Sequence, residues 1–567
     1  MIIQSREIGI VNADRLEPGL DLGLAVLEKD SVVRRVWDRD WTLWKPVDRE
    51  ISDRLGWLEA PETAVDSIPD LEVFAASLHG LGLTRAAVLG MGGSSLAPEV
   101  FARLFPTGPD GLEVEILDTT EPEDVATAAA RLPVDKTLFI VSSKSGTTSE
   151  MMALFSFFYD RAARELGAGH VGSRFVAVTD PGTPLETLAR ERRFRCVFHG
   201  RPDIGGRFSA LSAFGLLPAA LKGIDLHRLV APARVMAEAC RAEKPADNPG
   251  ARLGAILGSA ALGGRDKLTF LMAPRLRPFA AWLEQLLAES TGKEGRGIVP
   301  VIEDRPGPAA NYGPDRLFVE IGPAGPQTAK PGSPGPEGSS SPLVRIPFEN
   351  PYDLAAHFFL WEFATAVAGR FLGINPFDQP DVESAKKRTR EVLAAAKEEA
   401  PAGETGGRPF AGGLRAPGPA QAAEPRAAFT ALLAGHGEED YLAILAFLPR
   451  NPAIEQMLSA LAASVRLKRG LPVTVGFGPR YLHSTGQLHK GDGNHGLFLM
   501  LVAAGLPELG IPEVAGVKRP APDFGALFRA QARGDALALT EKGRRVLTLE
   551  LGSPVAQGLA TLSSFLE

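Results

Sequence analysis

The sequence predicts an α/β protein built on parallel sheets. Short apolar runs alternate with helix-like stretches between about residues 65 and 225, and the alternation restarts near residue 267 and again beyond residue 426. In the first of these regions the strand-like runs are residues 86–89, 114–117, 138–141 and 175–178. Strands that alternate with helices form βαβ units, whose strands run parallel. We therefore expect several parallel sheets, each covered by helices.

The order of these patterns divides the 567 residues into five expected segments. They are a helical N-terminal extension (1–60), two α/β domains (61–228 and 229–396), a flexible linker (397–425) and a C-terminal α/β domain (426–567). The linker is rich in Ala, Gly, Pro and Glu, a composition that does not bury a core. A Pro/Gly/Ser stretch at 322–342 predicts a long surface loop within the second domain.

The composition narrows the class of protein. A net charge of -7 argues against a general nucleic-acid binder, which would carry a basic stripe. Two cysteines are too few for a disulfide framework or a multi-cysteine metal site, and no other metal site is expected. The N-terminus lacks the apolar segment of a signal peptide, and no charge-free run of about 18 apolar residues predicts a membrane helix. We expect a cytoplasmic protein with no membrane or nucleic-acid partner.

A glycine-rich turn follows the first predicted strand. Residues 89–98 read Leu-Gly-Met-Gly-Gly-Ser-Ser-Leu-Ala-Pro, and a helix is predicted to begin there. Glycines let the backbone approach a ligand closely, and a helix N-terminus offers free N–H groups. The motif lacks the Gly-Lys-Ser/Thr ending of a nucleotide P-loop. Gly93 and Ser94 are therefore candidate ligand contacts, with a purely structural turn as the alternative.

A cluster of hydroxyl side chains follows the strand at 138–141. Residues 142–150 read Ser-Ser-Lys-Ser-Gly-Thr-Thr-Ser-Glu and precede an apolar helix. Hydroxyls and N-terminal amides at such a turn suit the oxygens of a phosphate monoester, and a lysine adds positive charge. One hydroxyl would suffice as an N-cap, the alternative reading. The candidate phosphate ligands are Ser143, Lys144, Ser145, Thr147 and Thr148.

Together these two loops resemble those of the sugar isomerase domain, a flavodoxin-like module that binds phosphosugars. The segment Gly-Gly-Arg-Phe-Ser at 205–209 makes the resemblance more specific, because it looks like a signature of the phosphoglucose isomerase family. By this resemblance Gly206 lies against the substrate and Arg207 stabilises negative charge that develops on it. A structural arginine after a tight turn is the alternative. The expected fold is two flavodoxin-like sugar isomerase domains followed by the C-terminal α/β domain.

Two further segments are similar to segments of the same family. Gln285 and Glu289 are four residues apart and share a helix face. The pattern Gln-x-x-x-Glu-Ser-x-Gly-Lys looks like the family's base-bearing segment, which implies that Glu289 is the catalytic carboxylate and Gln285 a substrate contact. Residues 375–386 resemble the segment that carries an active-site lysine, which implies that Gln379 and Lys386 lie in the site.

The family also uses a histidine to open the sugar ring. In conventional members this histidine lies between the glutamate and lysine segments, and the present sequence departs from that order. Between the glutamate and lysine segments this chain has only His357, in an apolar helix context. Beyond the linker, the polar loop at 480–491 contains His483 and His489 and follows a strand-like run. A polar loop after an apolar strand is more often a site than a core. His483 is the first choice, and His489 and His357 stay open.

This arrangement resembles the isomerase portion of the fused transaldolase–phosphoglucose isomerases. A transaldolase barrel would need about 200 further residues, so no transaldolase activity is expected. The resemblance implies reversible isomerisation of glucose 6-phosphate and fructose 6-phosphate through a cis-enediol(ate). Such chemistry needs a base, an electrostatic stabiliser and a proton shuttle, and no cofactor.

Two other functions remain compatible with the sequence. One is an isomerase that also accepts mannose 6-phosphate. The other is a non-catalytic phosphosugar sensor, which would keep the hydroxyl loops but would not need Glu289. A homo-oligomer is also compatible with the sequence, and the role of the linker stays open.

Overall fold

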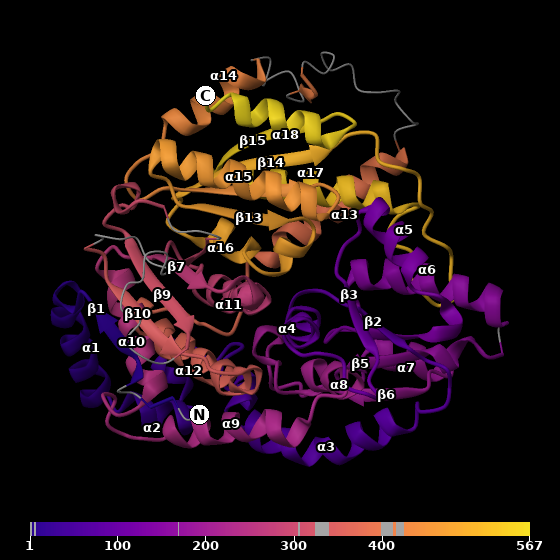
Figure 1. Cartoon of the computed structure of the whole chain (residues 1–567), viewed down its shortest axis with the longest axis horizontal. Helices are drawn as coiled ribbons and strands as arrows, with labels where there is room; N and C mark the ends of the chain where they lie inside the picture. The colour runs from indigo at the N-terminus through magenta and orange to yellow at the C-terminus, as the bar shows by residue number, and fades with distance from the viewer. Residues whose placement is uncertain are drawn as a thin grey trace.

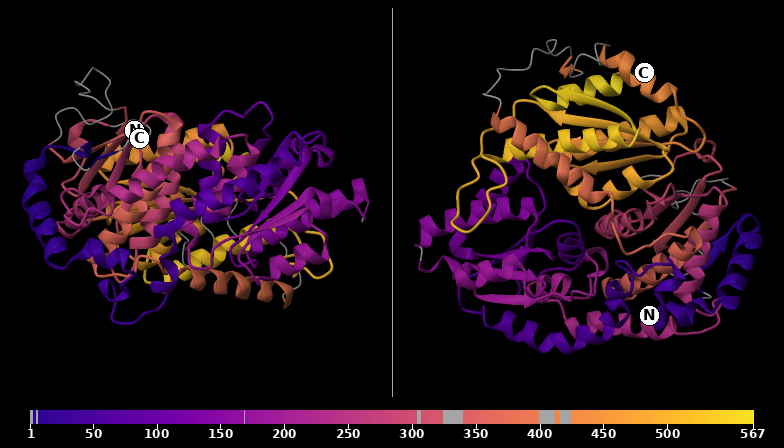
Figure 2. Two further views of the ribbon diagram at one scale, coloured as in Figure 1. Left: turned by 90° about the horizontal axis from the view of Figure 1, so that it is seen from below. Right: turned by 180° about the vertical axis from the view of Figure 1, so that it is seen from behind.

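The computed structural model describes residues 3, 4, 7–167, 169–303, 307–323, 340–398, 412–415 and 424–567. Within them the chain forms three five-stranded sheets, each accompanied by helices (Figure 1). The first sheet lies at the lower right of Figure 1, the second at the left and the third at the top, and Figure 2 shows them from two further sides. The predicted α/β class with parallel sheets is confirmed.

The first sheet is entirely parallel and has the order β3-β2-β4-β5-β6. Its strands are β2 (Arg85–Leu89), β3 (Glu113–Leu117), β4 (Thr137–Ser142), β5 (Phe175–Thr179) and β6 (Cys196–His199). Its helices are α4 (Leu96–Leu104), α5 (Pro122–Arg131), α6 (Ser149–Leu166), α7 (Pro184–Glu191) and α8 (Ala213–Leu221). Counted along the chain, this is the order 2-1-3-4-5 of flavodoxin-like sheets.

Both faces of the three central strands β2, β4 and β5 are buried, which explains why these strands are continuous apolar runs, whereas the edge strand β3 alternates and is partly exposed. Neighbouring residues of one strand enter different cores: Val88 packs with α4 and α8, whereas Leu89 packs with α5 and α6. All four predicted strand runs lie within strands of this sheet.

The second sheet has the order β1-β10-β9-β7-β8. Its strands are β1 (Gly9–Val11), β7 (Lys267–Met272), β8 (Val299–Ile302), β9 (Arg316–Gly322) and β10 (Leu343–Pro347), and only β1 is antiparallel. The accompanying helices are α9 (Leu226–Ala239), α10 (Pro249–Leu262), α11 (Arg277–Thr291) and α12 (Leu354–Leu372). Apart from Arg370 and Phe371, every residue of α12 is buried, as expected of a helix that is apolar all round.

The N-terminal segment is not purely helical. It contains α1 (Glu17–Lys29) and α2 (Val32–Trp37), followed by α3 (Ala60–Ala76), but β1 precedes them and pairs with the edge strand β10. Three residues are too few to show a strand periodicity in the sequence, so only the partner strand identifies β1.

The third sheet has the order β11-β15-β14-β12-β13. Its strands are β11 (Leu414–Arg415), β12 (Tyr441–Phe447), β13 (Val473–Phe477), β14 (Gly496–Ala503) and β15 (Arg545–Leu551), and only β11 is antiparallel. The helices of this part are α13 (Val382–Glu398), α14 (Pro425–Ala434), α15 (Pro452–Arg469), α16 (Gly486–Gly491), α17 (Phe524–Glu541) and α18 (Val555–Ser564). The second and third sheets thus share one topology, a parallel 2-1-3-4 order with a short antiparallel strand at one edge.

Most of the stretch expected as a linker, and most of the Pro/Gly/Ser stretch at 322–342, lies outside the described residues. Within the expected linker, Leu414 belongs to β11. Its side chain is buried because β11 pairs with β15 and contacts α18. Among the described helices, none combines the length and the apolar composition needed to cross a bilayer.

The topology of the first sheet identifies where a ligand would bind. After β2 the chain passes to β3 on one side, and it then crosses to β4 on the other. Open α/β sheets bind ligands at the carboxyl ends of the strands where the direction of winding changes. The glycine-rich turn follows β2 and the hydroxyl loop follows β4, so both predicted motifs flank this switch point.

Candidate active site

The glycine-rich turn lies directly against the Gly206–Arg207 turn. A Cβ atom on Gly93 would stand 2.0 Å from the carbonyl oxygen of Gly206, so only glycine fits there. Gly92 has a φ of 57°, in the left-handed region that glycine tolerates best. Ser94 is buried beside these residues. The close contact brings Arg207 next to the switch point of the first sheet.

The hydroxyl loop is ordered by its own side chains. The Oγ atom of Ser143 lies 2.9 Å from Oγ1 of Thr148 and accepts a hydrogen bond from the backbone N–H of Gly146 at 3.1 Å. Ser145 and Thr147 form a second hydroxyl pair at 3.0 Å, and the bond between them lies at the surface. This outer pair precedes the N-terminus of α6, which begins at Ser149.

The ammonium of Lys144 already has partners within the protein. It forms an ion pair with Asp180 and donates to the carbonyl oxygens of Arg201 and Pro202 at 3.0 and 3.2 Å. This contact ties the hydroxyl loop to the segment that leads into Arg207. The role of Lys144 as a phosphate ligand stays a prediction.

Arg207 joins three separate parts of the chain. Its Nε donates to Oγ of Ser290 at 2.7 Å, and its two terminal nitrogens donate to Oε1 of Gln379 at 2.9 Å and to the carbonyl oxygen of Pro376 at 2.6 Å. The guanidinium also lies 3.3 Å from a carboxylate oxygen of Glu289. Arg207 is buried, so its positive charge is fixed in place by these acceptors before any ligand binds.

Gln285 and Glu289 share one face of α11, as their spacing predicts. The amide of Gln285 donates to a carboxylate oxygen of Glu289 at 3.2 Å and to the carbonyl oxygen of His483 at 2.7 Å. Gln285 Oε1 is buried and has no hydrogen-bond partner among the described residues. The side chain of Glu289 is 13% exposed, so the carboxylate remains reachable. Gln285 therefore connects the carboxylate to the His483 turn and keeps one acceptor free.

His483 belongs to the short 3-10 turn Arg480–His483, which follows β13. Its Nε2 lies 3.0 Å from a carboxylate oxygen of Glu150, in the first turn of α6. Burial alone would raise the pKa of Glu150, but the charge and hydrogen bond of His483 lower that pKa to about 2. Glu150 is thus an ionised partner that holds the imidazole, an arrangement suited to proton transfer.

The other two histidines lie in cores. His357 is fully buried, its Nε2 lies 2.9 Å from the carbonyl oxygen of Pro347, and its ring contacts those of Phe279 and Phe348. His489 is also buried, and burial lowers its pKa well below the ordinary value. Of the three histidines, His483 is the one in contact with other predicted site residues.

The segment at 375–386 reaches the site through its first half. Gln379 contacts Arg207, as described above, whereas Lys386 forms an ion pair with Glu383 at 2.8 Å on the exposed side of α13. Helix α13 also contacts the 3-10 turn that contains His483. The structure therefore brings Gln379 into the cluster and leaves Lys386 at its border.

Two residues of the cluster were not singled out by the sequence. One is Glu150, which the sequence shows only as the last residue of the hydroxyl motif. The other is Lys293, whose buried ammonium lies 2.7 Å from both the carbonyl oxygen of Asn375 and a carboxylate oxygen of Asp378. Burial, followed by the charge of Arg207, lowers the pKa of Lys293 to about 7. Each of the two is the charged last residue of a recognised motif, which was the available signal.

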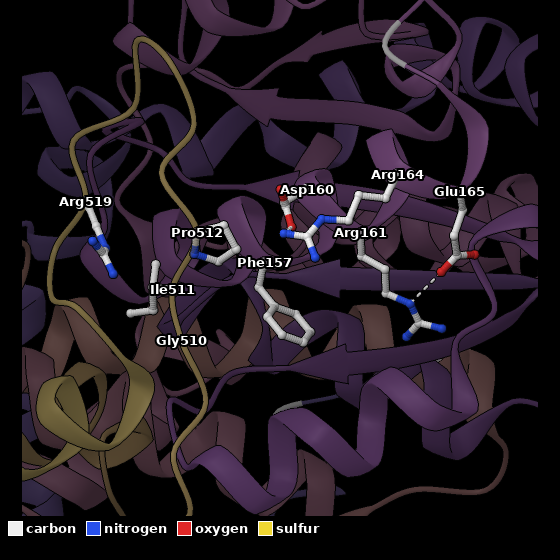
Figure 3. A pocket seen from close by; sticks show the side chains of 9 residues that line it. All are labelled: Phe157, Asp160, Arg161, Arg164, Glu165, Gly510, Ile511, Pro512 and Arg519. Atoms are coloured by element: carbon white, nitrogen blue, oxygen red, sulfur yellow. Dashed lines mark hydrogen bonds and ion pairs between the residues drawn. The ribbon is translucent and has the colours of Figure 1, made fainter.

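A separate hollow of about 660 Å³ lies away from this cluster (Figure 3). It is bounded by the outer side of α6 and by the loop at 510–519, and none of the predicted site residues lines it. Four of its charged side chains pair with each other, Arg161 with Glu165 and Arg164 with Asp160, and Arg519 pairs with Glu513 outside the lining. Within the described residues, no three side chains of His, Cys, Asp or Glu gather closely enough to hold a metal ion.

Comparison with known proteins defines the class of protein. A protein from Thermus thermophilus, of known structure, superposes with a TM-score of 0.56 at 26% identity, over 68% of this chain and all of that one. A glucose-6-phosphate isomerase from Chlamydia trachomatis gives the same TM-score at 19% identity, over 67% of this chain and 86% of its own. The fold is therefore that of phosphosugar isomerases.

The particular family follows from sequence. The family model described as phosphoglucose isomerase matches residues 78–303. A glucose-6-phosphate isomerase from Synechococcus sp. is 31% identical over 405 residues, which cover 59% of this chain and 74% of that protein. The Rubrobacter xylanophilus enzyme of the same name is 29% identical and is covered to 89%. The chain belongs to the phosphoglucose isomerase family, as predicted, and its likeness to the fused transaldolase subgroup stays a prediction.

Proposed function

We propose that this protein is a glucose-6-phosphate isomerase that interconverts glucose 6-phosphate and fructose 6-phosphate through a cis-enediol(ate). The observation that carries the proposal is the convergence of Glu289, Arg207 and His483 at the switch point of the first sheet. A carboxylate, a fixed positive charge and a carboxylate-bound imidazole are the three groups that the isomerisation needs. Each comes from a different part of the chain, linked by the hydrogen bonds of Gln285 and Arg207.

In this proposal the substrate phosphate binds the hydroxyl loop. The outer pair Ser145 and Thr147 and the ordered pair Ser143 and Thr148 offer hydroxyl donors at the start of α6, where the helix dipole favours an anion. Gly93, Ser94 and Gly206 form the floor on which the sugar would lie. The free acceptor of Gln285 then receives a hydrogen bond from a sugar hydroxyl.

His483 opens the sugar ring by moving a proton between the ring oxygen and the anomeric hydroxyl. Histidine suits this step because its ordinary pKa of about 6.5 lets it both give and accept a proton near neutral pH. Glu289 then moves the proton between C1 and C2, since one carboxylate above the enediol serves both carbons. Arg207 stabilises the charge on the enediolate oxygen, and Lys386 adds positive charge from the border of the site.

The proposal extends to the setting of the reaction. Hexose phosphates are the partners, the cytoplasm is the location, and no cofactor takes part. Association of several copies stays a prediction. Use of mannose 6-phosphate, and a non-catalytic sensor role, remain the alternatives, and the second does not require the contacts around Glu289.

The test is Glu289→Gln in a coupled assay that starts from fructose 6-phosphate. Loss of a general base lowers kcat by about 10² to 10⁴-fold, while the unfolding midpoint stays near that of the unmodified protein. The same exchange at Glu294, which pairs with Lys45 at the surface, is the matched control and leaves kcat unchanged. Activity of Glu289→Gln within a few-fold of the unmodified protein would contradict the assignment. A parallel assay with mannose 6-phosphate measures the alternative substrate.

A further inference from the structure

Helix α17 carries two buried polar side chains that the proposed reaction does not yet use. Gln531 and Asp535 are one turn apart on the same face of this helix, and both are at most 2% exposed. Polar groups buried in a helix face stabilise the fold only when they are hydrogen-bonded, so their partners show what they hold. The helix packs against β12, β14 and β15 and also contacts α13 and α16 (Figure 1).

Gln531 contacts the carboxylate that holds the imidazole. Its Nε2 donates to Oε1 of Glu150 at 2.7 Å, and its Oε1 accepts from the hydroxyl of Thr120 at 2.6 Å. The ionised Glu150 can only accept hydrogen bonds, which fixes the orientation of the amide. Oε1 of Glu150 is also the oxygen that lies 3.0 Å from Nε2 of His483. One carboxylate oxygen is thus shared by Gln531 and the histidine.

Asp535 contacts the loop that carries the histidine. One carboxylate oxygen accepts from the hydroxyl of Tyr481 at 2.6 Å, and the other lies 2.6 Å from the ammonium of Lys490. The same ammonium donates to the carbonyl oxygen of Gly486 at 3.1 Å. Tyr481 precedes His483 by two residues and Lys490 follows it by seven, so Asp535 fixes both sides of the loop.

We propose that Gln531 and Asp535 are positioning residues that set His483 and Glu150 at their working distance. The inference rests on the proposed function of His483 in ring opening. The two partners of this acid–base pair are 333 residues apart; Glu150 lies in α6 beside the first sheet, and His483 lies in the turn that follows β13 of the third sheet. Gln531 binds the carboxylate of Glu150, and Asp535, one turn further along α17, binds the loop that carries His483. Helix α17 therefore keeps the imidazole at hydrogen-bonding distance from Glu150.

The first test removes each hydrogen bond with the least change in shape. Gln531→Met keeps the length of the side chain and loses the amide, and Tyr481→Phe keeps the ring contact with Phe447 and loses the hydroxyl. We expect each variant to lower kcat on cyclic glucose 6-phosphate by about tenfold with KM within about twofold. Gln557→Met, at an exposed glutamine of α18, is the matched control and leaves both constants unchanged.

The second test asks whether these residues act through the histidine. Each exchange is repeated in the His483→Ala background, where a residue that only positions His483 has nothing left to position. We expect no further loss of kcat beyond about twofold there. Full additivity of the losses, or single variants with unchanged kcat, would overturn the inference.

A spectroscopic readout keeps this inference separate from the proposed function. The ring ¹⁵N chemical shifts of His483 report its Nε2 hydrogen bond whether or not the protein isomerises a sugar. We expect these shifts to change in Gln531→Met and to stay in Gln557→Met. An unmodified protein without isomerase activity would defeat the proposed function alone, whereas unchanged His483 shifts in Gln531→Met would defeat the positioning role alone.

Discussion

At the scale of single residues, three histidines show how environment separates a proton carrier from a core side chain. His483 faces an ionised carboxylate and is partly exposed, whereas His357 and His489 are enclosed beside aromatic rings. A histidine that must carry a proton needs a neighbour that stabilises its charged form. Of these three environments, that of His483 provides such a neighbour, Glu150. The choice of His483 as the proton carrier therefore rests on its surroundings and not on its position along the chain.

His357 should make the protein acid-sensitive. Burial lowers its pKa from the ordinary 6.5 to about 4, so between these values the unfolded chain binds a proton that the folded one does not. Stability is therefore full above pH 6.5 and falls as the pH is lowered towards 4, by about 3 kcal/mol in total. Denaturant unfolding at about pH 7.5 and about pH 5 measures the part of this loss that is reached by pH 5, about 2 kcal/mol. His357→Phe, which suits the surrounding rings, should reduce the difference, and an equal difference in both proteins would exclude the effect.

The outer hydroxyls of the phosphate loop give a second prediction at this scale. Ser145→Ala combined with Thr147→Val removes an exposed pair whose hydrogen bonds join only residues 145 and 147, whereas Ser143 bonds across the loop to Thr148 and Gly146. The phosphate is remote from C1 and C2, so we expect KM to rise by about tenfold or more with a smaller fall in kcat. Steady-state kinetics measure the two constants. Ser173→Ala, at a serine that binds a local carbonyl, is the control, and a fall confined to kcat would contradict phosphate binding.

At the scale of elements, the sequence predicted what local chemistry determines. The central strands of the first sheet were visible because both of their faces are buried, and glycines and hydroxyls marked the ends of β2 and β4. What stayed hidden depends on partners distant in sequence. Strands β1 and β11 are defined by their pairing with β10 and β15, which are far away in the sequence. The contact of Glu150 with His483 likewise joins residues 333 positions apart.

The close contact between the glycine-rich turn and the Gly206–Arg207 turn leads to a further prediction. Gly93 and Gly206 meet so closely that a methyl group on Gly93 would collide with backbone, which cannot move aside as a flexible side chain could. We expect Gly93→Ala to lower kcat by about tenfold or more, because Arg207 moves with its turn, and to lower stability by about 1–3 kcal/mol. Gly205→Ala places its methyl in ordinary contact with Phe208 and serves as the control. Equal activity of the two variants would show that the contact is not needed.

At the scale of the whole molecule, the C-terminal part is not a separate body. Ile511, Phe524 and Leu527 belong to the same apolar core as α5 and α6, and β12 and β14 share another core with Val299 and Val301 of the second sheet. The C-terminal part therefore completes two cores that begin elsewhere in the chain, one through α17 and the loop before it and the other through the third sheet. This explains how a loop late in the sequence reaches a site built around the first sheet.

Buried charges join the third sheet to the first. Arg480, three residues before His483, forms ion pairs with Glu99 of α4 and with Asp118 after β3, the latter at 2.9 Å. Burial alone would raise the pKa of Glu99, but Arg480 and Arg450 lower it to about 2. The stability that this carboxylate supplies is therefore present above about pH 4.5 and is lost as the pH falls towards 2. Arg480 thus links the docking of the two sheets to the position of the histidine turn.

Arg480→Met is the variant that tests this link. The thioether keeps part of the packing, but Glu99 and Asp118 lose the partner of a buried charge, which costs about 3–5 kcal/mol in such pairs. Because the His483 turn is anchored by the same side chain, we expect kcat to fall as well. Arg519→Met removes an ion pair with the exposed Glu513 and should change stability by no more than about 1 kcal/mol. Denaturant unfolding and steady-state kinetics measure both effects. Adding Glu99→Gln to Arg480→Met should restore part of the lost stability, since it removes a buried charge that keeps only the more distant Arg450 at 3.9 Å as a partner. If Arg480→Met instead unfolds like Arg519→Met and keeps full activity, apolar packing alone holds the third sheet in place.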